Sequence, residues 1–146
     1  MESMSRTRIV FSVVFLLSGV SAKAQSIHRD SIAGVWTCVE AKLPEGLKIP
    51  AEEVEAINML KLAIVKSKFL FKTNGLFEWQ FQKDAPAVFQ QIDFLNNQKW
   101  SVDSNKRMIY IGAPSENLMQ IIIHEKEGIV YFVIPDTPLL LRMKKE

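Results

Sequence analysis

The chain has 146 residues, of which 48% are hydrophobic and 23% charged, with 18 basic residues, 16 acidic residues and one cysteine. This length suits one domain with one core, and a single cysteine excludes an intramolecular disulfide. The net charge of only +2 argues against a nucleic-acid-binding protein, which needs a dense basic face.

The first 24 residues have the features of a secretory signal peptide. Arg6 and Arg8 form a basic start, and residues 9–20 form an apolar run that is too short to span a bilayer as a helix. Ala22-Lys23-Ala24 is a small-residue cleavage site, so Gln25 would begin the mature protein. We therefore expect an exported, soluble protein, either periplasmic or extracellular.

Cleavage would also change the charge balance. It would remove three basic residues and one acidic residue, leaving 15 of each sign. No cysteine stands at the cleavage point, so we do not expect a lipoprotein. Cys38 lies in an apolar segment instead, which favours a buried and inert thiol. No later apolar run is long enough to cross a membrane.

Residues 25–31 are short and polar, and we expect them to form a disordered arm before a single domain over residues 32–146. The first predicted strand covers Gly34 to Ala41. Strict alternation would place Trp36, Cys38 and Glu40 on one face of it, and residues 35, 37 and 39 on the other.

A helix is predicted over residues 51–65, after a turn rich in proline and glycine. Pro50 suits the helix start, and the glutamates that follow favour its N-terminus. Apolar residues recur at three- to four-residue spacing at Val54, Ile57, Leu60 and Ile64. This apolar face either packs on the sheet or forms a lid over a ligand entrance, and we favour packing because a short helix needs buried contacts to be stable.

A hairpin follows, with strands over residues 68–73 and 76–83. Asn74-Gly75 between them is the strongest turn signal in the chain, because both residues tolerate positive φ. Phe77, Trp79 and Phe81 alternate with polar residues that include Glu78, which indicates an aromatic face in the core and a polar face in solvent.

The rest of the chain contains five more predicted strands, over residues 99–103, 107–111, 118–124, 129–134 and 139–144. Residues 84–98 show no clear period, and a short strand, a helical turn and an apolar loop all remain open for them. About eight strands in consecutive hairpins predict an all-β, up-and-down antiparallel barrel with one helix inserted between the first two strands. Closure would remove the exposed edges of such apolar strands.

Four segments carry a resemblance to a known family. They are Gly34-Val35-Trp36, residues 69–77 (FLFKTNGLF), Lys99-Trp100-Ser101-Val102-Asp103 and residues 139–144 (LLLRMK). In this order they resemble the lipocalin-like domains of exported bacterial proteins, relatives of the calycin barrels.

The resemblance implies a barrel closed by Gly34, Trp36 and a basic side chain of the last strand. Arg142 is the residue placed to make that cation–π contact. The chain differs from longer lipocalins in the position of its helix and in lacking disulfides.

Two functions follow from these predictions. The first is binding of a small hydrophobic ligand in the barrel interior, within a cavity lined by aromatic residues. The second is a structural or protein-interaction domain whose interior is filled by its own side chains. The residues predicted to line such a cavity, besides Trp36, are Phe69, Phe71, Phe77, Trp79, Phe81, Trp100, Tyr110 and Phe132.

Catalytic and metal-binding motifs are not found in the sequence. His28 and His124 have no cysteine or paired carboxylate at ligand spacing. There is no G-x-S-x-G nucleophile motif and no glycine-rich phosphate loop. We therefore expect a protein that is not an enzyme and that needs no cofactor or metal.

Overall fold

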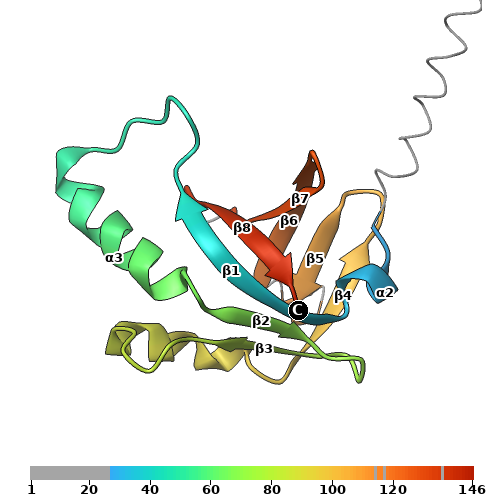
Figure 1. The fold of residues 1–146 in the computed structure, drawn as a ribbon. Coiled ribbons are helices and arrows are strands. Elements are labelled where there is room, and N and C mark those ends of the chain that lie inside the picture. Colours follow the sequence, from blue (N-terminus) through green and yellow to red (C-terminus); the bar gives the residue numbers. More distant parts are fainter. Residues whose placement is uncertain (1–26, 114, 117, 136) are drawn as a thin grey trace, which may run out of the picture.

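The computed structural model describes residues 27–146 except 114, 117 and 136 (Figure 1). Each strand pairs with its neighbours in the sequence, and the first pairs with the last, so the sheet is a closed barrel. The predicted eight-stranded, up-and-down antiparallel barrel is confirmed, as is the helix between its first two strands. The strands are β1 (Gly34–Lys42), β2 (Lys68–Phe71), β3 (Leu76–Gln80), β4 (Gln98–Asp103), β5 (Met108–Ile111), β6 (Met119–Lys126), β7 (Ile129–Val133) and β8 (Leu140–Lys145).

A β-bulge interrupts the alternation of β1. Trp36 and Cys38 are buried, and the register with β8 then shifts between Cys38 and Glu40. The extra residue brings Ala41 to the inner face and leaves Glu40 outside, with its carboxylate 3.9 Å from Nε of Arg142. The prediction that Glu40 shares a face with Trp36 and Cys38 is therefore wrong, because a strict period of two does not include a bulge.

The β2–β3 hairpin turns at the predicted Asn-Gly pair. Gly75 has a φ of +91°, and its N–H donates to the carbonyl of Lys72 at 2.9 Å. Asn74 keeps a negative φ, and its Oδ1 accepts the N–H of Leu76 at 3.0 Å. Of the two residues expected to allow positive φ, only the glycine adopts it.

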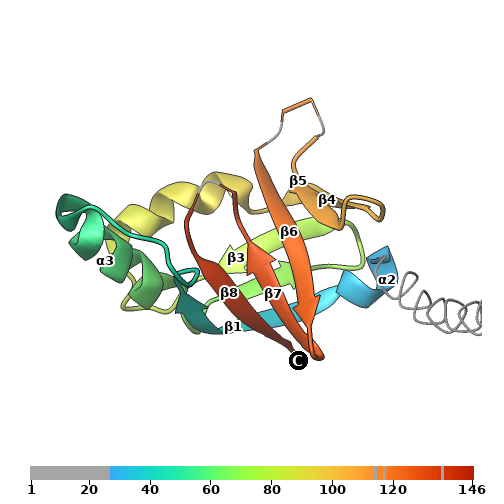
Figure 2. The ribbon, with the colours of Figure 1, turned by 90° about the horizontal axis from the view of Figure 1, so that it is seen from above.

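The seam between β3 and β4 is the shortest in the barrel. Its register covers two pairs, Leu76 with Lys99 and Phe77 with Gln98, whereas every other neighbouring pair of strands matches at least four. Beyond Phe77, the 3-10 helix η2 lies beside β3, in the position that a longer β4 would occupy (Figure 2). The barrel wall is therefore completed by a helix at this point.

Residues 84–98 adopt the helical alternative of the three left open by the sequence. The helix is η2 (Ala87–Leu95). Phe89 and Ile92 are half-buried and Leu95 is buried, at a spacing of three residues. A 3-10 helix has three residues per turn, so these positions share one side of it.

The predicted helix over residues 51–65 forms as a 3-10 turn, η1 (Ala51–Glu53), followed by α3 (Val54–Ile64). Both views show α3 and η2 on one side of the barrel and α2 on the opposite side (Figures 1 and 2). Part of the predicted apolar face contacts the core, but Val54 is 43% exposed because the start of α3 lies away from the sheet. The positions of that face that reach the core are Ile57, Leu60 and Ile64.

The segment before β1 is structured over the residues that the structure describes, in contrast to the disordered arm predicted for residues 25–31. The helix α2 (Arg29–Ile32) follows Ile27. Ile27 and Ile32 are 7% and 3% exposed, so their burial holds this segment on the barrel. The predicted signal peptide and its cleavage site lie outside the described residues. No helix in the described part of the chain is long and apolar enough to cross a membrane.

Candidate functional site

The centre of the barrel is filled by four of the eight residues predicted to line a cavity. Phe69, Phe71, Phe77 and Phe132 have no exposed surface. The ring centroids lie 5.3 Å apart for Phe71 and Phe77, and 5.5 Å apart for Phe69 and Phe132. Rings at these separations are in contact with one another, so they occupy the space that an interior ligand would need.

Tyr110 lies on the outer face of β5, so its predicted interior position is wrong. Ile109 and Ile111 on either side of it are fully buried, and alternation turns residue 110 outward. On the outer face it pairs across the sheet with Ser101 and Gln120.

Trp100 closes the end of the barrel that α2 covers. It is 3% exposed, and its Nε1 donates to the carbonyl of Lys72 at 2.9 Å. The guanidinium of Arg29 lies 4.1 Å from the ring centroid, and its Nη1 donates to the Trp100 carbonyl at 3.3 Å. A cation–π contact therefore fixes the ring of Trp100, and hydrogen bonds fix its indole N–H and its carbonyl, as expected of a structural residue.

Trp36 contacts Lys145 rather than the expected Arg142. The ammonium of Lys145 lies 5.8 Å from the Trp36 ring centroid, and the indole N–H donates to the carbonyl of Ile32 at 2.8 Å. Arg142 is 44% exposed and faces Glu40, because its neighbours Leu141 and Met143 take the inner face of β8. The predicted closing contact thus involves the correct strand but the wrong residue.

Gly34 lies directly beside the side chain of Lys145. Its φ is +132°, and a Cβ there would lie 3.0 Å from Cε of Lys145. Lys145 also donates to the carbonyl of Ser31 at 3.0 Å. The close approach of Gly34 lets one lysine join β8, β1 and α2.

An aromatic row leads from the barrel centre to the surface. The ring centroids are 4.5 Å apart for Phe69 and Trp79, 4.8 Å for Trp79 and Phe81, and 5.7 Å for Phe81 and Phe89. Phe69 is fully buried, Trp79 is 8% exposed, and the last two rings are half-buried. The hydroxyl of Ser67, itself fully buried, accepts the Trp79 indole N–H at 3.0 Å and fixes this ring.

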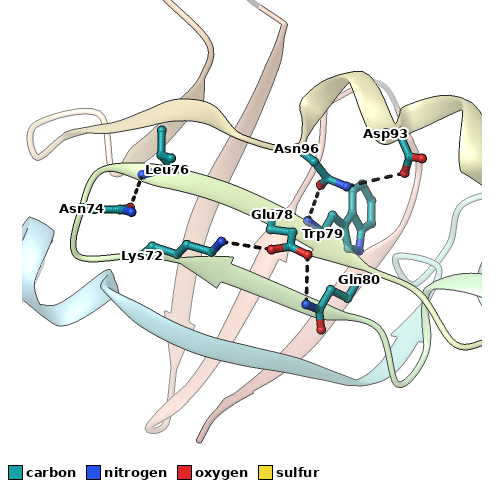
Figure 3. Close-up of polar contacts among 8 residues, drawn as sticks. All are labelled: Lys72, Asn74, Leu76, Glu78, Trp79, Gln80, Asp93 and Asn96. Atoms are coloured by element: carbon teal, nitrogen blue, oxygen red, sulfur yellow. Dashed lines mark hydrogen bonds and ion pairs between the residues drawn. The ribbon is translucent and has the colours of Figure 1, made fainter.

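A groove of about 460 Å³ lies where this row meets the surface, between the end of β3 and η2. Asn96 holds the two elements together, because its Oδ1 accepts the backbone N–H of Trp79 at 2.8 Å (Figure 3). The groove therefore combines an aromatic wall with amide and charged groups. Its lining residues are Glu78, Trp79, Gln80, Phe81, Gln82, Lys83, Ala85, Pro86, Phe89, Asp93 and Asn96.

Glu78 is ionised and already paired. Its carboxylate accepts the amide of Gln80 at 3.0 Å and lies 3.1 Å from Nζ of Lys72 (Figure 3). The hydrogen bond from Gln80, with that from Lys72, lowers the pKa of Glu78 below its ordinary value of 4.5. A carboxyl group in this state does not donate a proton at neutral pH.

Two further pockets lie at the surface over β6, β7, β8 and β1. One has about 540 Å³ and includes Trp36, Met143 and Lys145, and the other has about 460 Å³ and includes His124 and Tyr131. His28 is the other histidine, at the N-cap of α2. No group of three or more histidine, cysteine, aspartate or glutamate residues in the described part of the chain could hold a metal ion.

Sequence reasoning placed Trp79 and Phe81 on the inner face but missed the groove that they border. Phe89, Asp93 and Asn96 belong to the region without a clear period. The spacing of three between Phe89, Ile92 and Leu95 is the signal that could have indicated a 3-10 helix.

No family model, curated protein or solved structure matches this chain.

Proposed function

We propose that this protein is an exported, non-enzymatic binding module with a lipocalin-like barrel that serves as a filled scaffold. Its ligand site is the groove between β3 and η2. The ligand is a small molecule with an apolar face and a few hydrogen-bonding groups. We thus place the ligand in this groove and not in the barrel interior.

The observation that carries the proposal is the aromatic row that ends in the groove. Phe81 and Phe89 are only half-buried, so a ligand that covered them would remove apolar surface from water. The groove volume of about 460 Å³ falls within the range usual for small-molecule sites, about 300–1,000 Å³.

The polar groups at the groove suit binding better than catalysis. Asn96 already accepts a hydrogen bond from the backbone N–H of Trp79. Glu78 already forms an ion pair with Lys72 and a hydrogen bond with Gln80. The lowered pKa of Glu78 removes a general acid at neutral pH, and no histidine lines the groove. The amide nitrogens of Gln80 and Gln82 already donate to Glu78 and to the carbonyl of Lys66. Their amide oxygens and the ammonium of Lys83 are therefore the rim groups that can orient a ligand.

Titration with the apolar dye anilinonaphthalenesulfonate tests the groove directly. We expect saturable binding that quenches Trp79, and an affinity loss of about tenfold or more in Phe81→Ser and Phe89→Ser, since each removes buried apolar contact. Phe94→Ser is the matched control, because Phe94 is 54% exposed and outside the groove lining. Equal dye affinity in all three variants and the wild type would exclude the groove as the site.

A further inference from the structure

Asp93 brings an unpaired carboxylate to the groove between β3 and η2. It is exposed, and it is one of the residues that line the groove. Within the described part of the chain it forms no ion pair. Its only polar side-chain contact there is with Asn96, whose Nδ2 donates to its Oδ1 at 3.5 Å (Figure 3). The charge of Asp93 is therefore not neutralised by a neighbouring side chain.

Hydrogen bonds through Asn96 connect this carboxylate to the aromatic row. The Oδ1 of Asn96 accepts the backbone N–H of Trp79 at 2.8 Å, while its Nδ2 donates to Asp93. The backbone N–H of Asn96 also donates to the carbonyl of Asp93 at 2.9 Å. One residue thus joins the carboxylate of η2 to the strand that carries Trp79 and Phe81.

The end of η2 lacks the positive charge that the C-terminus of a helix favours. The last turn of η2 contains Asp93 and no basic residue. The aligned peptide dipoles place partial negative charge at this end of the helix, and the carboxylate of Asp93 adds to it. A positively charged group in the groove would therefore be attracted by both.

The aromatic rings of the groove favour the same sign of charge in a ligand. The planes of Trp79 and Phe81 meet at 32°, and those of Phe81 and Phe89 at 40°, which is closer to a stacked than to an edge-on arrangement. The face of an aromatic ring carries negative potential and attracts a cation within about 6 Å of the ring centroid. An aromatic wall beside a carboxylate is thus suited to an ammonium group.

We propose that the ligand of this groove is a cationic amphiphile. Its amine or quaternary ammonium group pairs with Asp93, and its apolar body lies on Phe81 and Phe89. This assignment rests on the proposed function, because it names the chemical class of ligand for the same groove. Asp93 is then the residue that selects the charge of the ligand.

Lys83 is the groove-lining residue that would favour an anion instead. It lies in the turn that follows β3, and its ammonium forms no ion pair with another described residue. A long side chain in such a turn loses conformational freedom when it pairs with a ligand. Asp93 has a shorter side chain on a helix and already contacts Asn96, so it is the better-ordered partner.

Two aromatic probes of opposite charge test this assignment. Phenyltrimethylammonium is a cation and anilinonaphthalenesulfonate is an anion, and the binding of each can be followed at low salt by quenching of tryptophan fluorescence. In Asp93→Asn we expect the affinity for the cation to fall about threefold and the affinity for the anion to rise, because one exposed charge has been removed. A variant that only distorted the groove would weaken the binding of both probes.

Two further variants complete the test. Asp30→Asn removes the same charge from α2, on the opposite side of the barrel, and should leave both affinities unchanged. Phe89→Ser should weaken both probes, because it removes apolar contact that they share.

Equal affinities of Asp93→Asn and the wild type for phenyltrimethylammonium, or weaker binding of both probes to Asp93→Asn, would overturn the assignment of a cationic ligand. The groove itself would still be supported if the binding of anilinonaphthalenesulfonate depended on Phe89. Failure of the ligand class and failure of the groove are therefore distinguishable.

Discussion

At the scale of single residues, Trp36 connects the barrel wall to α2, the short helix that covers one end of the barrel. Trp36 is 6% exposed, and the centroid of its ring lies 5.4 Å from that of Phe132. Its indole N–H donates a hydrogen bond to the carbonyl of Ile32 in α2. We expect Trp36→Ala to lower the free energy of unfolding by about 3–5 kcal/mol, as for other large-to-small core changes. Chemical denaturation followed by circular dichroism would measure this.

Arg142→Ala is the informative comparison, because Arg142 was the residue expected to cover Trp36. Its side chain is 44% exposed, and its contact with Glu40 is long, at 3.9 Å. We expect a change below about 0.5 kcal/mol. A loss as large as that of Trp36→Ala would show that Arg142 closes the barrel after all.

Cys38 should be unreactive in the folded protein. It has no exposed surface, and burial raises the pKa of its thiol from 9.0 to about 11. A disulfide reagent at pH 8 should therefore label Cys38 only as fast as the protein unfolds, and labelling in denaturant should be immediate. Rapid labelling under native conditions would contradict the buried position.

The same pKa shift predicts that the free energy of unfolding decreases at high pH. The folded state favours the neutral thiol, so the contribution of Cys38 is complete below pH 9 and is lost as the pH rises toward 11. Unfolding measured over this interval should show stability falling more steeply in the wild type than in Cys38→Ala.

At the scale of elements, the β2–β3 hairpin depends on one glycine. Gly75 has a φ of +91°, and a Cβ there would lie 3.5 Å from Nη2 of Arg29. We expect Gly75→Ala to destabilise the protein by about 1 kcal/mol or more, because alanine is strained at this φ. Thr73→Ala in the same turn should cost less than half as much, and equal effects in denaturation would argue against a backbone cause.

Sequence periodicity located the strands well and the helical elements less well. The hairpin of β2 and β3 was predicted from alternation and an Asn-Gly turn, which are both local signals. The helix η2 was only one of three alternatives left open for residues 84–98, because its apolar residues recur every three positions and match neither the period of an α-helix nor that of a strand.

At the scale of the whole molecule, strand count and order were predictable, whereas the contents of the barrel were not. Alternation assigned Phe69, Phe71 and Phe77 to the inner face, but it could not say whether their rings meet across the interior. Ring contacts from Phe69 and Phe71 on β2 to Phe132 on β7 depend on barrel diameter and side-chain rotamers. The bulge in β1 and the choice of Lys145 over Arg142 depend on register in the same way.

Native mass spectrometry of the protein purified from its own host tests most directly whether a filled barrel binds its ligand in the β3–η2 groove. We expect a small bound mass on the wild type and on Phe94→Ser, and its loss from Phe81→Ser and Phe89→Ser while both variants stay folded. Retention of the same mass by both groove variants, or no bound mass on the wild type, would contradict a ligand site in this groove.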